Sequence, residues 1–96
     1  MFDQTFRALG DPTRREILRL LRDTDLNAGD IAAEFPISWA SVSRHLQVLR
    51  DAGLVLATRE GQHIRYSLNT TVFQDAVQHL ADLAPGRKRR KGDPDA

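Results

Sequence analysis

Residues 40–47 place small, polar and basic side chains at the spacing of one helix face. The four residues at i, i+3, i+4 and i+7 are Ala40, Ser43, Arg44 and Gln47. A small residue allows the backbone to come close to a ligand, serine and glutamine can hydrogen-bond to a base edge, and arginine can donate two hydrogen bonds to guanine. This set favours contact with the major groove of DNA. A solvent-exposed helix face without a ligand is the alternative, because any exposed helix carries polar residues.

The start of the same segment supplies further candidate contacts. Ser38 is placed to cap a helix over residues 38–52, which Gly53 is placed to end. Ser41 and the free N–H groups of this helix start would suit a phosphate. Trp39 is unusual in a first turn, where a polar residue is the ordinary exposed choice. Packing over the neighbouring helix is the favoured interpretation of Trp39, and stacking against a sugar and a thymine methyl group is the alternative.

A second group of basic and polar side chains falls within seven residues of a predicted hairpin. Extended runs at 54–58 and 63–68 flank the connection 59–62, which contains a glycine. Alternation places residues 63 and 65 on one face and residues 64, 66 and 68 on the other. Basic side chains at a hairpin tip suit phosphates or a narrow minor groove, whereas an ordinary charged hairpin is the alternative. The candidate contacts here are Arg59, Gln62, His63 and Arg65.

These side chains need a scaffold of helices, and the sequence marks where most of them begin. Asp11 followed by Pro12 and Asn27 are helix-start signals, and Asn69 caps a last helix. The apolar stripe 31–35 predicts a short helix that Pro36 ends, because the ring disfavours helical geometry at Phe35. The tight turn to the helix 38–52 predicts a helix-turn-helix. The expected fold is mostly α with a β-hairpin, a winged helix-turn-helix with five helices.

Length and composition limit the other possibilities. The chain has 96 residues, 41% hydrophobic and 28% charged, which corresponds to one domain with a thin core. We expect a domain over 1–84 and a disordered basic tail over 85–96. Residues 87–91 hold five of the fourteen basic residues, so 1–86 carry nine basic and eleven acidic residues. The position of each charge therefore matters more for nucleic-acid binding than the net charge of +1.

Several classes of protein are disfavoured. The chain has no cysteine, which excludes a disulfide framework, a thiolate metal site and a cysteine nucleophile. No secretory signal and no apolar stretch near the ~20 residues of a membrane span are present, so a cytoplasmic location is expected. No HExxH motif, glycine-rich phosphate loop or Ser/His/Asp set is found. We therefore expect neither an enzyme nor a cofactor.

One polar group on the last helix could bind a metal ion. Asp75, His79 and Asp82 stand at i, i+4 and i+7, and an imidazole with carboxylates could hold zinc or manganese. A solvated polar face is the favoured interpretation.

The terminal helices carry more apolar surface than one small core needs. A symmetric homodimer would bury this surface and place two recognition helices about one DNA turn apart, where they would read an inverted repeat. The alternative is that both helices close over their own core. The candidate interface residues are Phe2, Phe6, Leu9, Phe73, Ala76, Val77 and Leu80.

Several motifs in order resemble a known family. The stretches LGDPTRREIL (9–18), SVSRHL (41–46) and AGLV (52–55) resemble the ArsR (arsenical-resistance-repressor-type) transcriptional regulators. REGQHIRYSLN (59–69) followed by TVF (71–73) is similar to the SdpR-like autorepressor subgroup. The resemblance implies a homodimeric winged-helix repressor that dimerises through its first and last helices. Many such regulators sense metals through cysteines before the recognition helix, and the matching stretch 26–31 has no soft ligand.

The expected function is a sequence-specific DNA-binding transcriptional repressor, acting on its own promoter or a neighbouring gene. The alternatives are a metal- or small-molecule-responsive sensor of the same type, or a winged-helix protein-interaction module. Double-stranded DNA and a second copy are the expected partners, and repression would be released by a protein partner, a small molecule or dilution. The basic tail is interpreted either as a flexible arm that adds phosphate contacts or as a solubilising end.

Overall fold

The computed structural model describes residues 2–86 and has the predicted order of five helices and a hairpin. The elements are α1 (Asp3–Leu9), α2 (Pro12–Asp23), β1 (Leu26–Asn27), α3 (Ala28–Ala32), α4 (Trp39–Asp51), β2 (Val55–Glu60), β3 (His63–Leu68) and α5 (Thr70–Asp82). The winged helix-turn-helix expected from the sequence is confirmed. Most of the expected tail, residues 87–96, lies outside the described part of the chain.

Four of the helices begin at the polar residues that marked their starts. The side chains of Asp11, Asn27, Ser38 and Asn69 each accept a hydrogen bond from the backbone N–H three residues on, at 3.1, 2.8, 3.1 and 3.4 Å. Each bond satisfies one of the N–H groups that a helix start leaves without a partner. The caps therefore fix where α2, α3, α4 and α5 begin.

The cap at Asp11 makes stability depend on pH. The hydrogen bond from the backbone N–H of Arg14 is the main cause that lowers the pKa of the Asp11 carboxyl below its usual value of 3.8. A lowered pKa in the folded state contributes stability that is present above the unfolded pKa and is lost as the pH falls through the folded one.

We expect Asp11→Ala to lower the free energy of unfolding by about 1 kcal/mol near neutral pH, the usual cost of a lost N-cap. Asp11→Asn keeps an acceptor but no charge, so its difference from the parent protein should shrink toward about pH 3. Urea unfolding of the three proteins at both pH values measures this. If the asparagine variant were less stable than the parent protein by the same amount at both pH values, the pH dependence assigned to Asp11 would be contradicted.

The sheet has three antiparallel strands in the order β1-β3-β2. The two-residue strand β1, in which Leu26 pairs with Tyr66, was not predicted. The hairpin connection is shorter than expected, because β2 continues to Glu60 and only Gly61 and Gln62 form the turn. Gly61 has a φ of 61°, a left-handed conformation that glycine adopts without strain and that allows so tight a turn.

The short helix α3 ends earlier than predicted. It stops at Ala32, and the N–H groups of Glu34 and Phe35 bond to carbonyls only three residues back. The α-helical hydrogen-bond pattern thus gives way to a tighter turn several residues before Pro36. The prediction that the helix continues to Phe35 is wrong. Phe35 still packs, partly buried, against the core.

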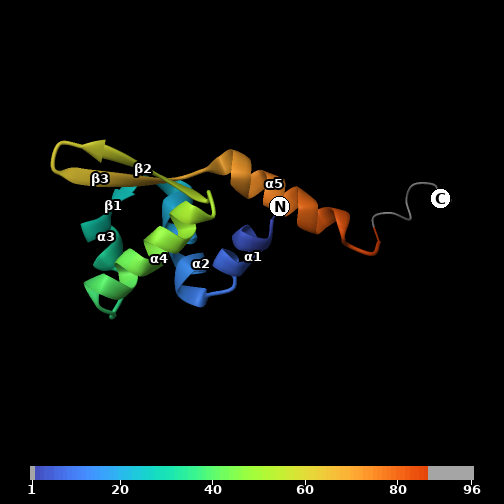
Figure 1. The fold of residues 1–96 in the computed structure, drawn as a ribbon, viewed down its shortest axis with the longest axis horizontal. Coiled ribbons are helices and arrows are strands. Elements are labelled where there is room, and N and C mark those ends of the chain that lie inside the picture. Colours follow the sequence, from blue (N-terminus) through green and yellow to red (C-terminus); the bar gives the residue numbers. More distant parts are fainter. Residues whose placement is uncertain (1, 87–96) are drawn as a thin grey trace.

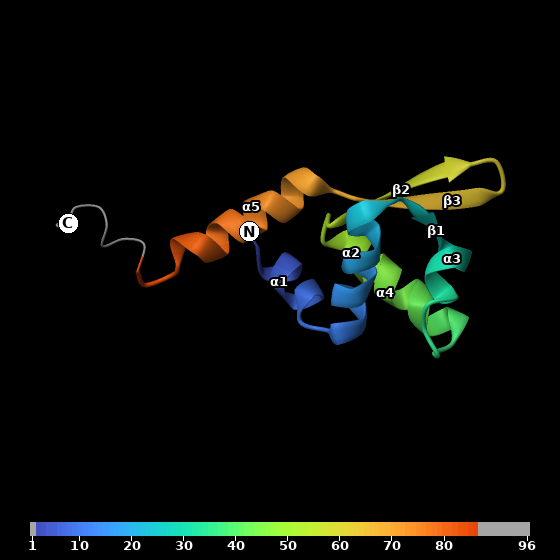
Figure 2. The same ribbon diagram turned by 180° about the vertical axis from the view of Figure 1, so that it is seen from behind.

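The core lies between the helices and the sheet, and α4 contributes three buried side chains to it. Val42, Leu46 and Leu49 are at most 1% exposed, as the helical spacing predicted. Both views show α5 and the β2–β3 hairpin, the wing, extending from opposite ends of the body, with α1 near α5 (Figures 1 and 2). In residues 2–86, no helix is long and apolar enough to cross a membrane.

Candidate DNA interface

The outward face of α4 is open to solvent over most of its length. Ala40, Ser43, Arg44 and Gln47 are all exposed, opposite the buried face of the same helix. Among the described residues, Ser43 and Arg44 make no side-chain hydrogen bond or ion pair. Their donors and acceptors are therefore available to a ligand such as a base edge.

Gln47 differs from the other residues of this face, since its side-chain amide nitrogen donates to the Asp51 carboxylate at 2.8 Å. Asp51 was not singled out from the sequence, although the i, i+4 spacing of glutamine and aspartate is a known stabilising pair on helices. The bond leaves the Gln47 amide oxygen as an acceptor. A carboxylate toward the C-terminal end of the face repels phosphate, so the N-terminal half of α4 is the better place for a nucleic-acid ligand.

Two serines form hydrogen bonds that cap the start of α4. Ser38 Oγ accepts from the Ser41 backbone N–H and donates to Ser41 Oγ, both at 3.1 Å. The remaining N–H groups of this first turn have the partial positive charge that suits a phosphate.

Trp39 lies mostly in solvent: it is 58% exposed, and Ile37 beside it is 40% exposed. This exposure disfavours the packing interpretation of Trp39. The exposed indole remains a candidate contact to a sugar or a thymine methyl group.

The wing presents its four candidates on two faces. Cross-strand partners share a face, and Arg59 pairs with Ile64 whereas Glu60 pairs with His63. Arg59 and His63 therefore point to opposite sides of the hairpin, and the structure does not bring all four candidates together. The predicted alternation is confirmed, because Tyr66 is buried whereas its neighbours on the other face are not.

Arg65 is held by acidic side chains. Its guanidinium lies 3.1 Å from the Glu60 carboxylate and 3.8 Å from that of Asp25. A phosphate would have to compete with these two carboxylates, which the sequence did not show because Asp25 is distant along the chain. Within residues 2–86, Arg59 bonds only to the Gly61 carbonyl, at 3.4 Å, so its guanidinium is less occupied than that of Arg65.

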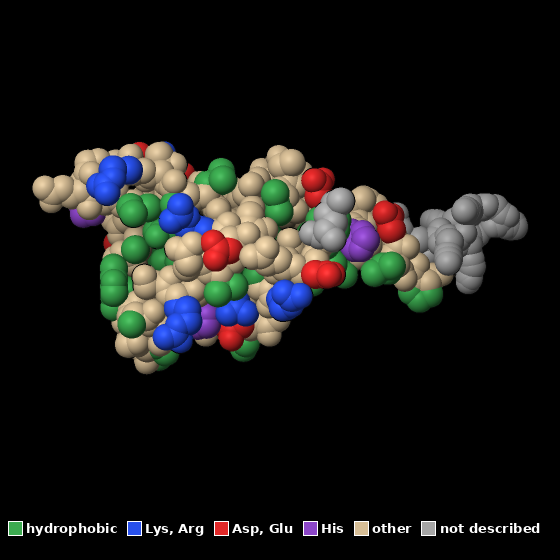
Figure 3. All heavy atoms as spheres, viewed as in Figure 1, with side chains coloured by type: hydrophobic (Ala, Val, Ile, Leu, Met, Phe, Trp, Pro, Cys, Tyr) green, Lys and Arg blue, Asp and Glu red, His purple; other side chains and the backbone are tan. Residues whose placement is uncertain are grey.

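The charges on one face of the molecule are unevenly distributed. The space-filling view shows basic side chains on the hairpin and over the body, with acidic ones among them on the body and further acidic ones toward α5 (Figure 3). The hairpin and the body thus carry most of the basic side chains seen on this face.

The terminal helices meet within the protomer and still leave apolar side chains uncovered. The rings of Phe2 and Phe6 lie against His79, with centroids 4.8 and 5.8 Å from that of the imidazole. Among the other candidate interface residues, Ala76 is buried, and Leu9 and Phe73 pack partly buried against the core. Three large side chains of α5 remain about half-exposed or more: Val77, Leu80 and Leu83.

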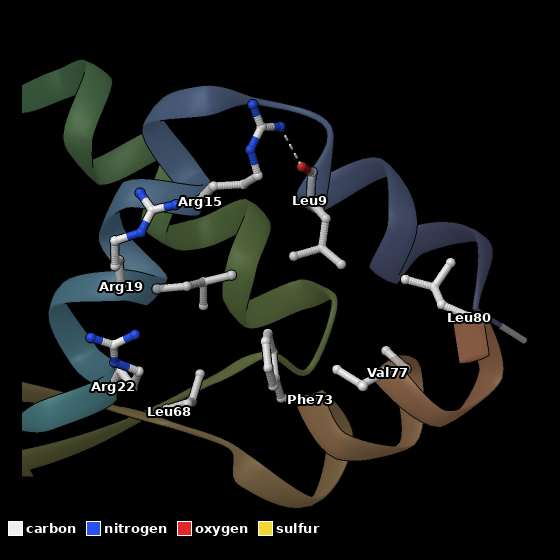
Figure 4. A pocket seen from close by; sticks show the side chains of 10 residues that line it. Leu9, Arg15, Arg19, Arg22, Leu68, Phe73, Val77 and Leu80 are labelled. Carbon is white, nitrogen blue, oxygen red and sulfur yellow. Dashed lines mark hydrogen bonds between the residues drawn. The ribbon is translucent and has the colours of Figure 1, made fainter. Parts of the chain in front are cut away.

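A hollow of about 330 Å³ lies between α2, the end of β3 and α5. Leu9, Leu68, Phe73 and Val77 point into it from several elements, while Arg15, Arg19 and Arg22 follow one another along α2 at its edge (Figure 4). The hollow is continuous with the exposed side chains of α5, since Val77 and Leu80 belong to both. Together they form one apolar surface at the α5 end of the molecule.

The polar group on α5 is arranged differently from a metal site. The His79 ring lies against two phenylalanines, and Asp82 accepts a hydrogen bond from Gln78 at 2.9 Å. Within residues 2–86, no three His, Cys, Asp or Glu side chains are close enough together to hold a metal ion. Asp75, His79 and Asp82 are thus not brought together.

Comparison with known proteins relates the chain to bacterial regulators. Residues 11–56 match the family described as bacterial regulatory protein, arsR family. The chain is 46% identical to the transcriptional repressor SdpR of Bacillus subtilis, over 97% of this chain and 98% of that protein. It is 48% identical to the HTH-type transcriptional regulator CmtR of Mycobacterium tuberculosis, over 80% of this chain and 65% of that protein.

A solved structure agrees with this relation. The ArsR-like transcriptional regulator from Rhodococcus sp. RHA1 superposes with a TM-score of 0.79 at 31% identity, over 93% of this chain and 84% of that one. The similarity covers both the helix-turn-helix and the terminal helices.

Proposed function

The chain belongs to the ArsR family of bacterial regulatory proteins, and we propose that it is a DNA-binding transcriptional repressor that acts as a homodimer on an inverted repeat. Repression is steric, because the bound dimer covers promoter DNA that the polymerase needs. Its own promoter is the first expected target, given the near full-length similarity to a repressor whose subgroup the wing segment 59–69 resembles.

The observation that carries this proposal is the outward face of α4. Ser43 and Arg44 are exposed, have no partner among the described residues, and lie beyond a capped helix start. In the proposed complex, Arg44 donates two hydrogen bonds to a guanine, Ser43 contacts a neighbouring base, and the first turn of α4 binds a phosphate. Arg59 and Gln62 contact the backbone or the minor groove beside it.

The apolar surface at the α5 end supports the homodimer. Val77 and Leu80 are 49% and 50% exposed on a helix of which Ala76 is the buried residue. A symmetric contact between two copies would remove these side chains from water. Such burial stabilises by about 25 cal/mol per Å² of apolar area. Two linked recognition helices would then bind two half-sites about one helical turn apart.

Selection of bound fragments from the host's genomic DNA tests the proposed function. Purified protein should enrich a small set of fragments that share an inverted repeat, with the promoter of its own gene among them. Recovery of random fragments at every salt concentration would contradict sequence-specific binding. Recovery of a specific set without its own promoter would contradict autorepression only.

We expect operator binding to need no metal ion. The chain has no cysteine, and His79 is packed against Phe2 and Phe6. Zinc, manganese or nickel should therefore change operator affinity by less than about tenfold, or ~1.4 kcal/mol of coupling, relative to a chelated control. A larger change that disappears in His79→Ala would show that α5 carries a metal sensor.

A further inference from the structure

Arg14 lies in the first turn of α2, the helix that runs between α1 and α4 in both ribbon views (Figures 1 and 2). Its Nε donates to the Ala8 carbonyl at 2.7 Å, and one terminal nitrogen donates to the Arg7 carbonyl at 3.2 Å. Carbonyls in the last turn of a helix lack partners further along it, and the helix dipole makes this end negative. One guanidinium therefore binds the C-terminal end of α1.

The other terminal nitrogen of Arg14 reaches α4, where it lies 3.2 Å from His45 Nδ1. A guanidinium has no acceptor, so Nδ1 is the acceptor of this hydrogen bond. The Asp11 carboxylate lies 3.8 Å from the same nitrogen. His45 is only 20% exposed and directly follows Arg44, so this contact holds α4 beside its proposed base-reading residue.

A second contact joins α1 to the end of α4. Thr5 is the one buried polar residue recorded in the described chain, and its hydroxyl points to the Ala52 carbonyl, at a long distance of 3.5 Å. Ala52 is the C-cap of α4. The recognition helix is thus attached to α1 at its middle and at its end. Phe6 of α1 and its N-cap residue Phe2 in turn lie against His79 of α5.

We propose that Arg14 is a positioning residue that fixes the recognition helix α4 relative to α1 and α5, and so sets the separation of the two recognition helices across the dimer. This inference rests on the proposed function. Because the proposed dimer is symmetric, a rotation of α4 relative to α1 occurs in both copies. The distance between the two recognition helices then no longer fits two half-sites about one turn of DNA apart. Arg14 therefore determines which half-site spacing is bound, without touching a base.

The test compares operators that differ only in spacing. The probes are the selected operator and versions with one base pair added or removed between the half-sites. The parent protein should bind the selected spacing at least about tenfold more tightly than the altered spacings. Arg14→Met should reduce this preference below about threefold, a change of the size usually measured for the coupling energy between groups in contact. Methionine keeps an unbranched, mostly aliphatic stem and removes all the hydrogen-bond donors of arginine.

Arg15→Met is the matched control. Arg15 is the next residue of α2 and donates to the Leu9 carbonyl of α1 at 2.9 Å, but it has no recorded bond to α4 in the described chain. The control loses the same charge and a bond to the same helix end. We expect it to keep the parent spacing preference, and an equal loss in both variants would overturn the assignment to the α1–α4 bridge.

A second pair of variants decides the question if Arg14→Met does not fold, which circular dichroism would show. His45→Asn keeps an acceptor near the position of Nδ1, whereas His45→Phe removes it. The spacing preference should survive in the asparagine variant and fall in the phenylalanine variant. Equal behaviour of the two, or a parent-like preference in a folded Arg14→Met, would overturn the inference. Failure of the parent protein to discriminate operator from random DNA would instead contradict the proposed function.

Discussion

Replacement of Arg44 by alanine should weaken operator binding by about 1–3 kcal/mol while changing the affinity for random DNA much less. The guanidinium is exposed on the outward face of α4 and makes no recorded bond to another described residue. Truncation therefore removes a ligand contact without breaking a contact of the fold. A base contact is lost only where the right base is present, so the ratio of operator to random affinity should fall.

Arg22→Ala is the matched control for this experiment. Arg22 lies at the end of α2 beside the hollow that faces α5, and its nearest acidic partner is Asp23. The control removes one positive charge outside the candidate DNA interface, so it should leave the ratio of operator to random affinity unchanged. Titration of labelled operator and random duplexes at one salt concentration measures both ratios. An Arg44→Ala protein that discriminates as well as the parent would remove Arg44 from the base-reading set.

The substitution Leu80→Asp should convert the proposed homodimer to monomers and abolish tight operator binding. Leu80 is half-exposed on α5 and would be covered by the second copy. A charge at that position would lose its hydration on association without gaining a partner, at a cost of several kcal/mol. Two unlinked half-site contacts would then bind far more weakly than one dimer.

Gln78→Glu is the control for Leu80→Asp, since Gln78 is exposed on the same helix and bonds only to Asp82 among the described residues. It adds a charge to α5 away from the apolar surface and should remain a dimer. Analytical ultracentrifugation at tens of micromolar separates the two outcomes. A parent protein that sediments as a monomer would contradict the homodimer directly, whatever the variants do.

Local signals predicted the scaffold well. Asp11, Asn27, Ser38 and Asn69 were recognised as caps because a cap depends on residues only a few positions apart. The outward face of α4 followed from the same kind of reasoning, since burial of Val42, Leu46 and Leu49 determines which residues point away. The motifs of the family added the expectation that the terminal helices associate.

Contacts between distant parts of the chain were not predictable in the same way. The Arg14–His45 bond joins residues 31 positions apart, and the carboxylate of Asp25 reaches Arg65 only because β1 pairs with β3. The strand β1 is too short to show an alternating pattern. The exposure of Trp39 was likewise not evident from its neighbours in sequence, because burial depends on the tertiary packing.

A footprint of the selected operator tests the central claim most directly. Hydroxyl-radical cleavage of that DNA, titrated with the parent protein, should show two equivalent protected half-sites related by a two-fold axis, about 10 base pairs apart between their centres. Both half-sites should fill together, with two chains per operator. Protection of a single half-site, independent filling of the two, or no protection at concentrations that retain the fragment would contradict a repressor that reads an inverted repeat as a homodimer.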